Sequence, residues 1–233
     1  RHPGDFVLWK PAAEEDPGWD SPWGRGRPGW HLECSAMIRE HLGDTIDIHG
    51  GGLDLLFPHH ECEIAQSVAA SGKDAVKYWM HNNMITINGQ KMGRSLGNFI
   101  TLDELFTGTH KLLEQAYSPM TIRFFMLQAH YRSTLDFSNH ALQAAEKGLE
   151  RMFEGAKTLK GLSYGEKSSF SIQEIIKSVY DAISDDLNSP IAIAKLFDAV
   201  RYINLIKDGK ESLNEADLKE LKDFFPYFIG EIL

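Results

Sequence analysis

The hydrophobic positions of the first hundred residues fall into short runs separated by Gly and Pro. Residues 1–30 are so rich in both that they allow at most one short strand, expected at residues 5–9. Apolar residues at helical spacing predict a helix over 31–42 that ends at Gly43, and residues 45–49 alternate as a strand does. A glycine loop at 50–52, a helix at 58–72 and a β hairpin at Asn88-Gly89 are expected next. This order predicts an α/β fold.

From residue 101 onward the pattern becomes helical, with explicit start signals. Two pairs fit capping boxes and two Ser-Pro pairs fit an N-cap followed by Pro: Thr101 with Glu104, Ser171 with Glu174, Ser118-Pro119 and Ser189-Pro190. Apolar residues at helical spacing over 172–183 and 193–203 predict a helical bundle, and residues 160–171 are expected to be a flexible connection. We therefore predict two domains, residues 1–117 and 118–233.

Composition narrows the class of protein. The 233 residues are 42% hydrophobic and 24% charged, without a long apolar run or an apolar N-terminal stretch, so a soluble, cytoplasmic protein with no membrane segment is expected. Two cysteines are too few for a disulfide framework. The net charge of −9 argues against a global basic field for nucleic acid, so any such contact needs a local patch or another domain. The start without Met suggests a piece of a longer protein.

Metal-ligating residue types gather in two places. Cys34 lies in the first predicted helix, and His59, His60, Cys62 and Glu63 lie in the second. His59 and Glu63 are one helical turn apart, so their side chains can bind one ion together. By chemistry alone the alternative is equally open: Cys34 as a buried structural residue beside a solvated acidic helix face.

Two segments carry a long resemblance to one family. Residues 29–37 (GWHLECSAM) and 49–63 (HGGGLDLLFPHHECE) resemble the cysteinyl-tRNA synthetases. The resemblance implies a Zn²⁺ site made by two cysteines, a histidine and a glutamate, of which Cys34, His59 and Glu63 are three, while the remaining cysteine would lie upstream of residue 1. Cys62 occupies a position where the family usually has Asn and is read as a half-buried helix residue. His60 is read as a neighbour without a ligand role.

The resemblance also implies a substrate pocket. Trp30 and His49 match positions that line the pocket for L-cysteine, and Asp54 matches an acidic position suited to the substrate ammonium group; core packing is the alternative for Trp30 and His49. Zn²⁺ with an open position binds a thiol far better than a hydroxyl, so serine would be rejected without an editing site.

Residues 91–98 (KMGRSLGN) resemble the KMSKS loop of class I synthetases. Lys91, Arg94 and Ser95 are the implied catalytic residues, and Arg94 is the implied contact to ATP, which such enzymes use with Mg²⁺. The cations can neutralise charge that develops as pyrophosphate leaves. The sequence departs from the family at Gly93, usually Ser, and at Arg94, usually Lys. A solvated hairpin tip is the alternative reading.

The helical half carries the resemblance further, through residues 130–138 (HYRSTLDFS) and 185–190 (DDLNSP). It implies the C-terminal half of a Rossmann-like class I catalytic domain followed by an all-α, DALR-like bundle, without the HIGH-motif half or most of the anticodon-binding domain. The implied activity of the parent, expected to be monomeric, is formation of cysteinyl-adenylate and transfer of cysteine to tRNA-Cys; the isolated chain is expected to be inactive. Alternatives are the cysteine ligase of mycothiol biosynthesis and a non-catalytic zinc-binding fragment or paralogue.

Overall fold

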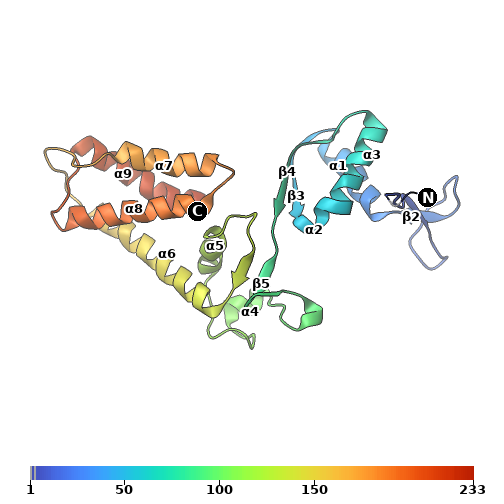
Figure 1. The fold of residues 1–233 in the computed structure, drawn as a ribbon, viewed down its shortest axis with the longest axis horizontal. Helices are drawn as coiled ribbons and strands as arrows, with labels where there is room; N and C mark the ends of the chain where they lie inside the picture. The colour runs from blue at the N-terminus through green and yellow to red at the C-terminus, as the bar shows by residue number, and fades with distance from the viewer. Residues whose placement is uncertain (1, 3) are drawn as a thin grey trace. The chain divides into compact units, whose positions relative to one another are not determined.

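The computed structural model describes residue 2 and residues 4–233, which form two compact units, one extending up to Met84 and the other from Ile85 to Leu233 (Figure 1). The first unit is α/β and the second is mainly helical, so the predicted fold class is confirmed. The predicted domain boundary at residue 117 stays a prediction, because a division by contacts does not delimit family domains.

The first unit opens with a two-stranded antiparallel ribbon. Strand β1 (Trp9–Pro11) pairs with β2 (Gly26–Pro28), with Trp9 opposite Pro28. The strand expected at residues 5–9 was therefore placed too early, and the expectation of at most one strand in residues 1–30 was wrong, since β1 forms only where β2 supplies a partner. Helix α1 (Trp30–Leu42) follows and ends at Gly43 with φ of 97°, as predicted from that glycine.

A strand–helix–strand crossover forms the centre of the first unit. Parallel strands β3 (Ile46–Gly52) and β4 (Val76–Asn82) are joined by α2 (Leu53–Leu55), a wider helical turn η1 (Leu56–His60) and α3 (Glu61–Ser71). Helix α1 packs against α3. The glycines expected to form a loop at 50–52 instead continue β3, because strand pairing with β4 extends to Gly52 opposite Asn82. Gly51 is required there, since a Cβ atom would lie 2.9 Å from Cε1 of His60.

The second unit begins with a small sheet in the order β6–β5–β7. Strand β5 (Ile85–Ile87) runs antiparallel to β6 (Gln90–Lys91) and parallel to β7 (Leu135–Phe137). Asn88 and Gly89 both have positive φ, 49° and 78°, which confirms the predicted tight hairpin turn. A short 3₁₀ turn η2 (Arg94–Leu96) follows the hairpin.

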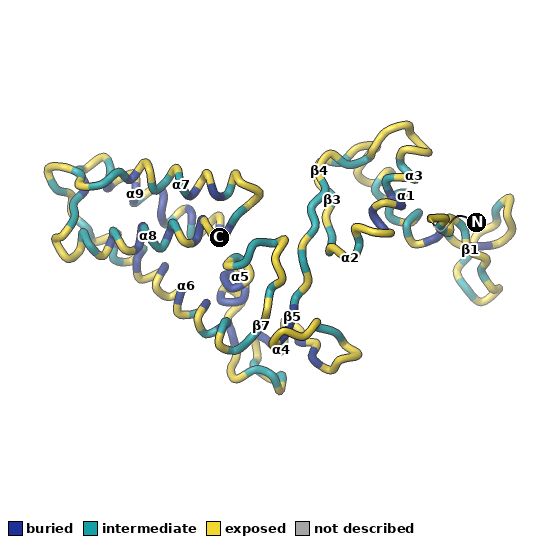
Figure 2. The backbone as a smooth tube through the Cα atoms, viewed as in Figure 1, coloured by how far each residue is buried: buried dark blue, intermediate teal, exposed yellow. Residues whose placement is uncertain are grey.

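Helices make up the rest of this unit. They are α4 (Leu102–Thr107), α5 (Pro119–Leu127), α6 (Asn139–Lys160), α7 (Ile172–Ser184), α8 (Ser189–Lys207), α9 (Glu215–Tyr227) and a final wide turn η3 (Phe228–Ile232). Buried residues line α5, α6 and α8 (Figure 2), and the main hydrophobic core lies entirely in this unit. The bundle is therefore confirmed, with residues 160–171 connecting α6 and α7.

The predicted helix starts are largely as expected. Thr101 and Glu104 form the complete capping box, and Ser118 caps α5 ahead of Pro119. Ser171 accepts a hydrogen bond from the backbone N–H of residue 174. Helix α8 differs by one residue: Asn188 is the cap, because its Oδ1 accepts from the backbone N–H of Ile191.

Candidate metal centre and nucleotide loop

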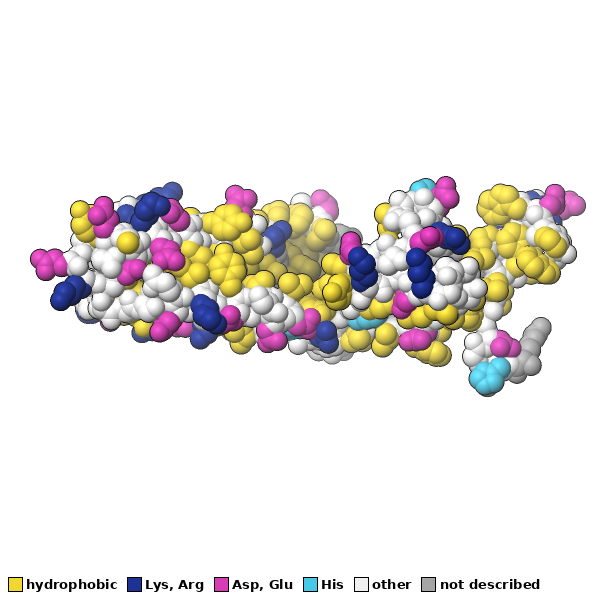
Figure 3. Space-filling model, turned by 90° about the horizontal axis from the view of Figure 1, so that it is seen from above, with side chains coloured by type: hydrophobic (Ala, Val, Ile, Leu, Met, Phe, Trp, Pro, Cys, Tyr) yellow, Lys and Arg dark blue, Asp and Glu magenta, His cyan; other side chains and the backbone are white. Residues whose placement is uncertain are grey.

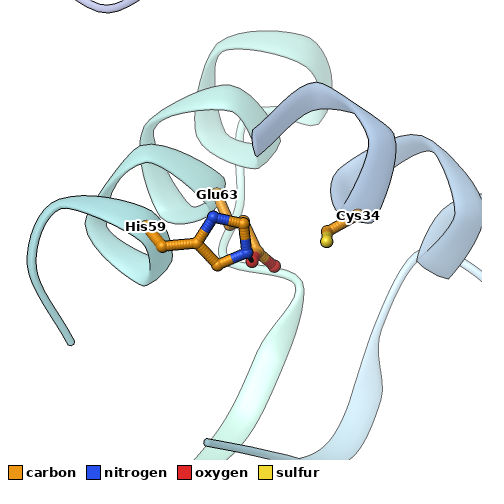
Figure 4. Close-up of side chains that lie close together, drawn as sticks. All are labelled: Cys34, His59 and Glu63. Carbon is orange, nitrogen blue, oxygen red and sulfur yellow. Dashed lines mark ion pairs between the residues drawn. The ribbon is translucent and has the colours of Figure 1, made fainter. Parts of the chain in front are cut away.

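Three donor side chains meet between α1 and the segment from η1 into α3. Cys34 projects from α1 toward His59 and Glu63 (Figure 4), and the donor atoms of these three residues lie within 4.8 Å of one another. His59 and Glu63 are buried and Cys34 is half-buried. The packing of α1 on α3 brings the sulfur to the pair that the helical turn already holds together. The structure thus brings together the three residues predicted as metal ligands.

The contact between His59 and Glu63 is close but is not a hydrogen bond. Nε2 of His59 lies 2.7 Å from Oε1 of Glu63, yet Oε1 is buried without a hydrogen-bond partner. An N–H at Nε2 therefore does not point at the carboxylate oxygen. On the other side of the same ring, Nδ1 of His59 lies 2.7 Å from Nδ1 of His31.

Burial also decides the charges of these donors. It raises the pKa of Glu63 to about 7, lowers the pKa of His59 and raises the pKa of Cys34. Nearby His31 and His49 further lower the pKa of His59, and Glu63 further raises that of Cys34. Near pH 7 His59 is accordingly neutral and Glu63 only partly ionised, so the two side chains do not form a full ion pair.

The donor set fits a thiophilic divalent cation. Thiolate, imidazole and carboxylate are ligands of Zn²⁺, and a bound cation favours the ionised forms of Cys34 and Glu63 that burial here disfavours. The buried, unpartnered Oε1 of Glu63 is the atom that most needs such a partner. Cys34, His59 and Glu63 can therefore hold a metal.

A second donor group shares Glu63. His49, His60 and Glu63 also place donor atoms within 4.8 Å, with Nδ1 of His49 3.7 Å from Oε2 of the carboxylate. His60 additionally lies 2.7 Å from His81 through Nδ1 and Nε2, and burial lowers the pKa of His60 to about 4. Sequence reasoning missed this group, because His60 was read as a bystander. The recurrence of histidines at 49, 60 and 81 was the available signal.

The other predicted site residues lie around these groups. Trp30 stacks on the His59 ring with centroids 4.2 Å apart, although 55% of its surface is exposed. His49 stacks on Trp79 at 4.7 Å. Asp54 is exposed on α2, just after the glycine strand. Within residue 2 and residues 4–233, neither donor group includes Cys62, which is buried in α3.

The predicted nucleotide loop is an ordered turn with exposed cations. Lys91 ends β6, and Arg94 and Ser95 lie in η2; all three are exposed. The Arg94 guanidinium sits 5.2 Å from the centroid of the Phe99 ring. The guanidinium is exposed and positively charged, so it can contact a phosphate.

Asn98 closes the loop from inside. Its buried side chain donates to the carbonyl oxygen of Lys91 at 3.1 Å and accepts from the N–H of Gly93 at 2.9 Å. These two bonds fix the backbone between the two cations of the loop. Asn98 ends the segment of residues 91–98 that resembles the KMSKS loop, but the sequence alone did not indicate this role.

Comparison with known proteins decides the family. The family model described as tRNA synthetases class I (C) catalytic domain matches residues 1–147, more than half of the chain. The chain belongs to the class I tRNA synthetases. A DALR domain model matches residues 178–233, in agreement with the helical second unit of this synthetase chain.

Curated relatives of this synthetase chain carry the name cysteine–tRNA ligase. The protein of Bacteroides thetaiotaomicron is 60% identical, and the alignment covers 100% of this chain and 48% of that protein. The protein of Parabacteroides distasonis is 61% identical over 98% of this chain and 47% of its own length. The protein of Chlorobaculum tepidum is 48% identical over 100% of this chain and 46% of its own length. The chain thus spans about half the length of the relatives it matches.

A solved structure supports the fold. The ternary complex of Agrobacterium radiobacter K84 agnB2 LeuRS with tRNA and LeuAMS aligns with a TM-score of 0.61 at 16% identity, covering 91% of this chain and 32% of that one. Among the described helices, none is long and apolar enough to cross a membrane.

Proposed function

We propose that the protein containing this chain is a cysteine–tRNA ligase, which joins L-cysteine to ATP as cysteinyl-adenylate and then transfers cysteine to tRNA-Cys. The observation that carries the proposal is the convergence of Cys34, His59 and Glu63 within a family-matched catalytic segment. Relatives of this name align over the whole chain, and the DALR match supports a tRNA-linked acceptor rather than an amino-sugar.

The three donors would hold Zn²⁺, with any further ligand supplied from outside these residues. When bound, Zn²⁺ supplies an open position with a strong preference for sulfur, so that a thiol is chosen over the hydroxyl of serine. The chain's own contribution is to bury the donors and fix their spacing. Selection by a specific ligand bond exceeds what the volume of a pocket can provide, so editing is unnecessary.

Trp30, His49 and Asp54 are proposed to surround the substrate. Trp30 covers the His59 ring, so its exposed face can close one side of a pocket at the metal. His49 has a buried Nδ1 without a hydrogen-bond partner, which leaves it available to a bound polar group. Asp54 offers an exposed carboxylate for the substrate ammonium.

The loop of Lys91, Arg94 and Ser95 is proposed to bind ATP, with Mg²⁺, during activation. The cysteine carboxylate attacks the α-phosphorus and the bond to pyrophosphate breaks, so negative charge moves onto the leaving group. Exposed cations on an ordered turn can stabilise that charge, and no general base is needed because the attacking group is already a carboxylate.

Binding of tRNA would rely on local contacts. The net charge is −9, and on the face of the helical unit seen in Figure 3 acidic and basic side chains are interspersed. Such a surface provides no broad cationic field for the phosphate backbone. A monomeric state and a cytoplasmic location remain part of this proposal.

The test uses the complete protein that contains this chain and begins with its metal content. We expect zinc in the unaltered protein and its loss in Cys34→Ser. Cys62→Ser, a matched change on the adjacent helix, should retain zinc. Zinc retained in Cys34→Ser and lost in Cys62→Ser would overturn the ligand assignment.

Activity is tested in two steps. Cysteine-dependent ATP–pyrophosphate exchange reports activation, and its absence would leave only a zinc-binding module. Transfer is then compared with tRNA-Cys and with glucosaminyl-inositol as acceptors. Acylation of tRNA-Cys is expected. Acylation of the amino-sugar alone would identify the protein as the cysteine ligase of mycothiol biosynthesis instead.

A further inference from the structure

His31 contacts the metal group without belonging to it. It follows Trp30 near the start of α1, is half-buried, and its Nδ1 lies 2.7 Å from Nδ1 of His59. Two ring nitrogens at this distance share one hydrogen, because two lone pairs or two N–H groups would repel each other. Either His59 or His31 is therefore the donor.

The second nitrogen of His59 distinguishes these arrangements. If His31 donated, neutral His59 would carry its hydrogen on Nε2, which faces Oε1 of Glu63 at 2.7 Å without forming a hydrogen bond. That hydrogen would make no hydrogen bond to Glu63 and would take the place of the lone pair that a bound cation needs. If His59 donates from Nδ1, its Nε2 presents a lone pair to the donor group instead.

We infer that His31 is a positioning residue for the metal site: by accepting a hydrogen bond at Nδ1, it selects the His59 tautomer whose Nε2 can bind a cation. The inference rests on the proposed metal site. A histidine ligand generally needs an acceptor at its other ring nitrogen, which fixes the tautomer and the ring orientation. Here that acceptor is another imidazole, supplied by the helix that also carries Cys34.

A purely packing role for His31 makes a different prediction. The ring also lies edge-on to Phe6 at 5.6 Å and stacks with Trp30 at 5.6 Å, contacts that an apolar side chain could replace. Only the acceptor role requires a lone pair at the δ position. Asn offers Oδ1 at that position, while Leu offers similar bulk without an acceptor.

The experiment uses the complete protein that contains this chain. It measures the Zn²⁺ affinity of the metal-free protein by competition with a chelator, and the absorption spectrum of the Co²⁺-loaded protein. We expect His31→Leu to bind Zn²⁺ about 10–100-fold more weakly, with an altered Co²⁺ spectrum, and His31→Asn to stay within about threefold of the unaltered protein. His41→Gln, an exposed histidine on the same helix, is the matched control and should have no effect.

Affinity of His31→Leu equal to that of the unaltered protein, or equal weakening by Leu and Asn, would overturn the inference and leave the proposed metal site standing. Absence of Zn²⁺ binding by the unaltered complete protein would instead overturn both the inference and the proposed metal site. The tautomer is read independently from the ring ¹⁵N shifts of the metal-free, unaltered protein, so the test does not depend on a variant that folds. A hydrogen on Nε2 of His59 would contradict the inference.

Discussion

Replacing Glu63 by Gln should stabilise the first unit in the absence of metal, and increasingly so as the pH rises. Glu63 is 97% buried, since its relative exposure is 3%, and burial raises its pKa from 4.5 to about 7. Between these values the folded chain holds a proton that the unfolded chain has released. Stability from this group therefore falls as pH rises from 4.5 to 7 and stays low above 7.

The magnitude follows from the size of the pKa change. Each pKa step corresponds to about 1.4 kcal/mol, so the full penalty on the folded state is about 3 kcal/mol above pH 7 and about 1 kcal/mol at pH 5. Gln cannot ionise and avoids this penalty. The gain in unfolding free energy from Glu63→Gln should therefore be about 2–3 kcal/mol larger at pH 8 than at pH 5.

Comparison of variants is essential because His60 acts in the opposite direction. Its pKa is lowered from 6.5 to about 4, so its contribution to stability rises with pH over that interval. The free energy of unfolding of the unaltered chain can therefore depend little on pH. The histidine contribution is present in both proteins, so it cancels when the unfolding free energy of the unaltered chain is subtracted from that of Glu63→Gln.

The assay is urea unfolding with EDTA, followed by tryptophan fluorescence. Trp9, Trp19, Trp23, Trp30 and Trp79 are the five tryptophans of the chain, and all lie in the first unit, so the signal reports that unit alone. Glu61→Gln, an exposed neighbour on α3, is the matched control and should give the same small difference at both pH values. A Glu63→Gln effect that is equal at both pH values, or larger at pH 5, would refute the reasoning.

Three further predictions concern the second unit. In the complete protein, Arg94→Ala should slow ATP–pyrophosphate exchange by about 10²–10³-fold and leave cysteine binding unchanged. Arg94→Lys should keep most of the exchange activity. Exchange at the parental rate in Arg94→Ala would show that the loop is a hairpin without a role in catalysis. Asn98→Ala should lower kcat for exchange more than it raises KM for ATP, since the loop loses the two hydrogen bonds from Asn98 to its backbone. Unchanged kinetics would contradict a role of Asn98 in holding the loop. Leu196→Ala, at a fully buried site of α8, should lower the free energy of unfolding by about 2–5 kcal/mol, measured by circular dichroism. Ile191→Ala, at an exposed site of the same helix, should change it little. Equal effects of the two substitutions would contradict the packing of α8.

The sequence predicted most reliably what depends on local chemistry. Thr101 and Glu104 cap each other across one turn, and Asn88-Gly89 adopts the positive φ angles that few other pairs tolerate. Spacing along one helix likewise placed His59 beside Glu63. Each of these features is decided within about five residues.

Features that depend on distant partners were predicted less well. The first strand was expected at residues 5–9 and lies at Trp9–Pro11, because the sequence does not reveal that residues 26–28 supply its partner. The glycines at 50–52 signalled a loop, yet pairing with β4 and the close approach of the His60 ring make them strand residues. The roles inferred for His31 and Asn98 depend on single atoms meeting, which residue types and spacing do not specify.

The site also explains how the first unit differs physically from the second. Among the described residues up to Met84, the buried side chains are those of His59, His60 and Glu63, with Cys62 as the buried hydrophobic one, whereas the large apolar core lies beyond Ile85. A unit whose buried groups are polar gains little from apolar burial and loses stability wherever a buried carboxyl ionises without a partner. A cation at Glu63 would remove that penalty and add its own binding free energy, so ligation and folding are coupled in this unit. The residues proposed to choose the substrate are thus the same residues on which the stability of their own unit depends.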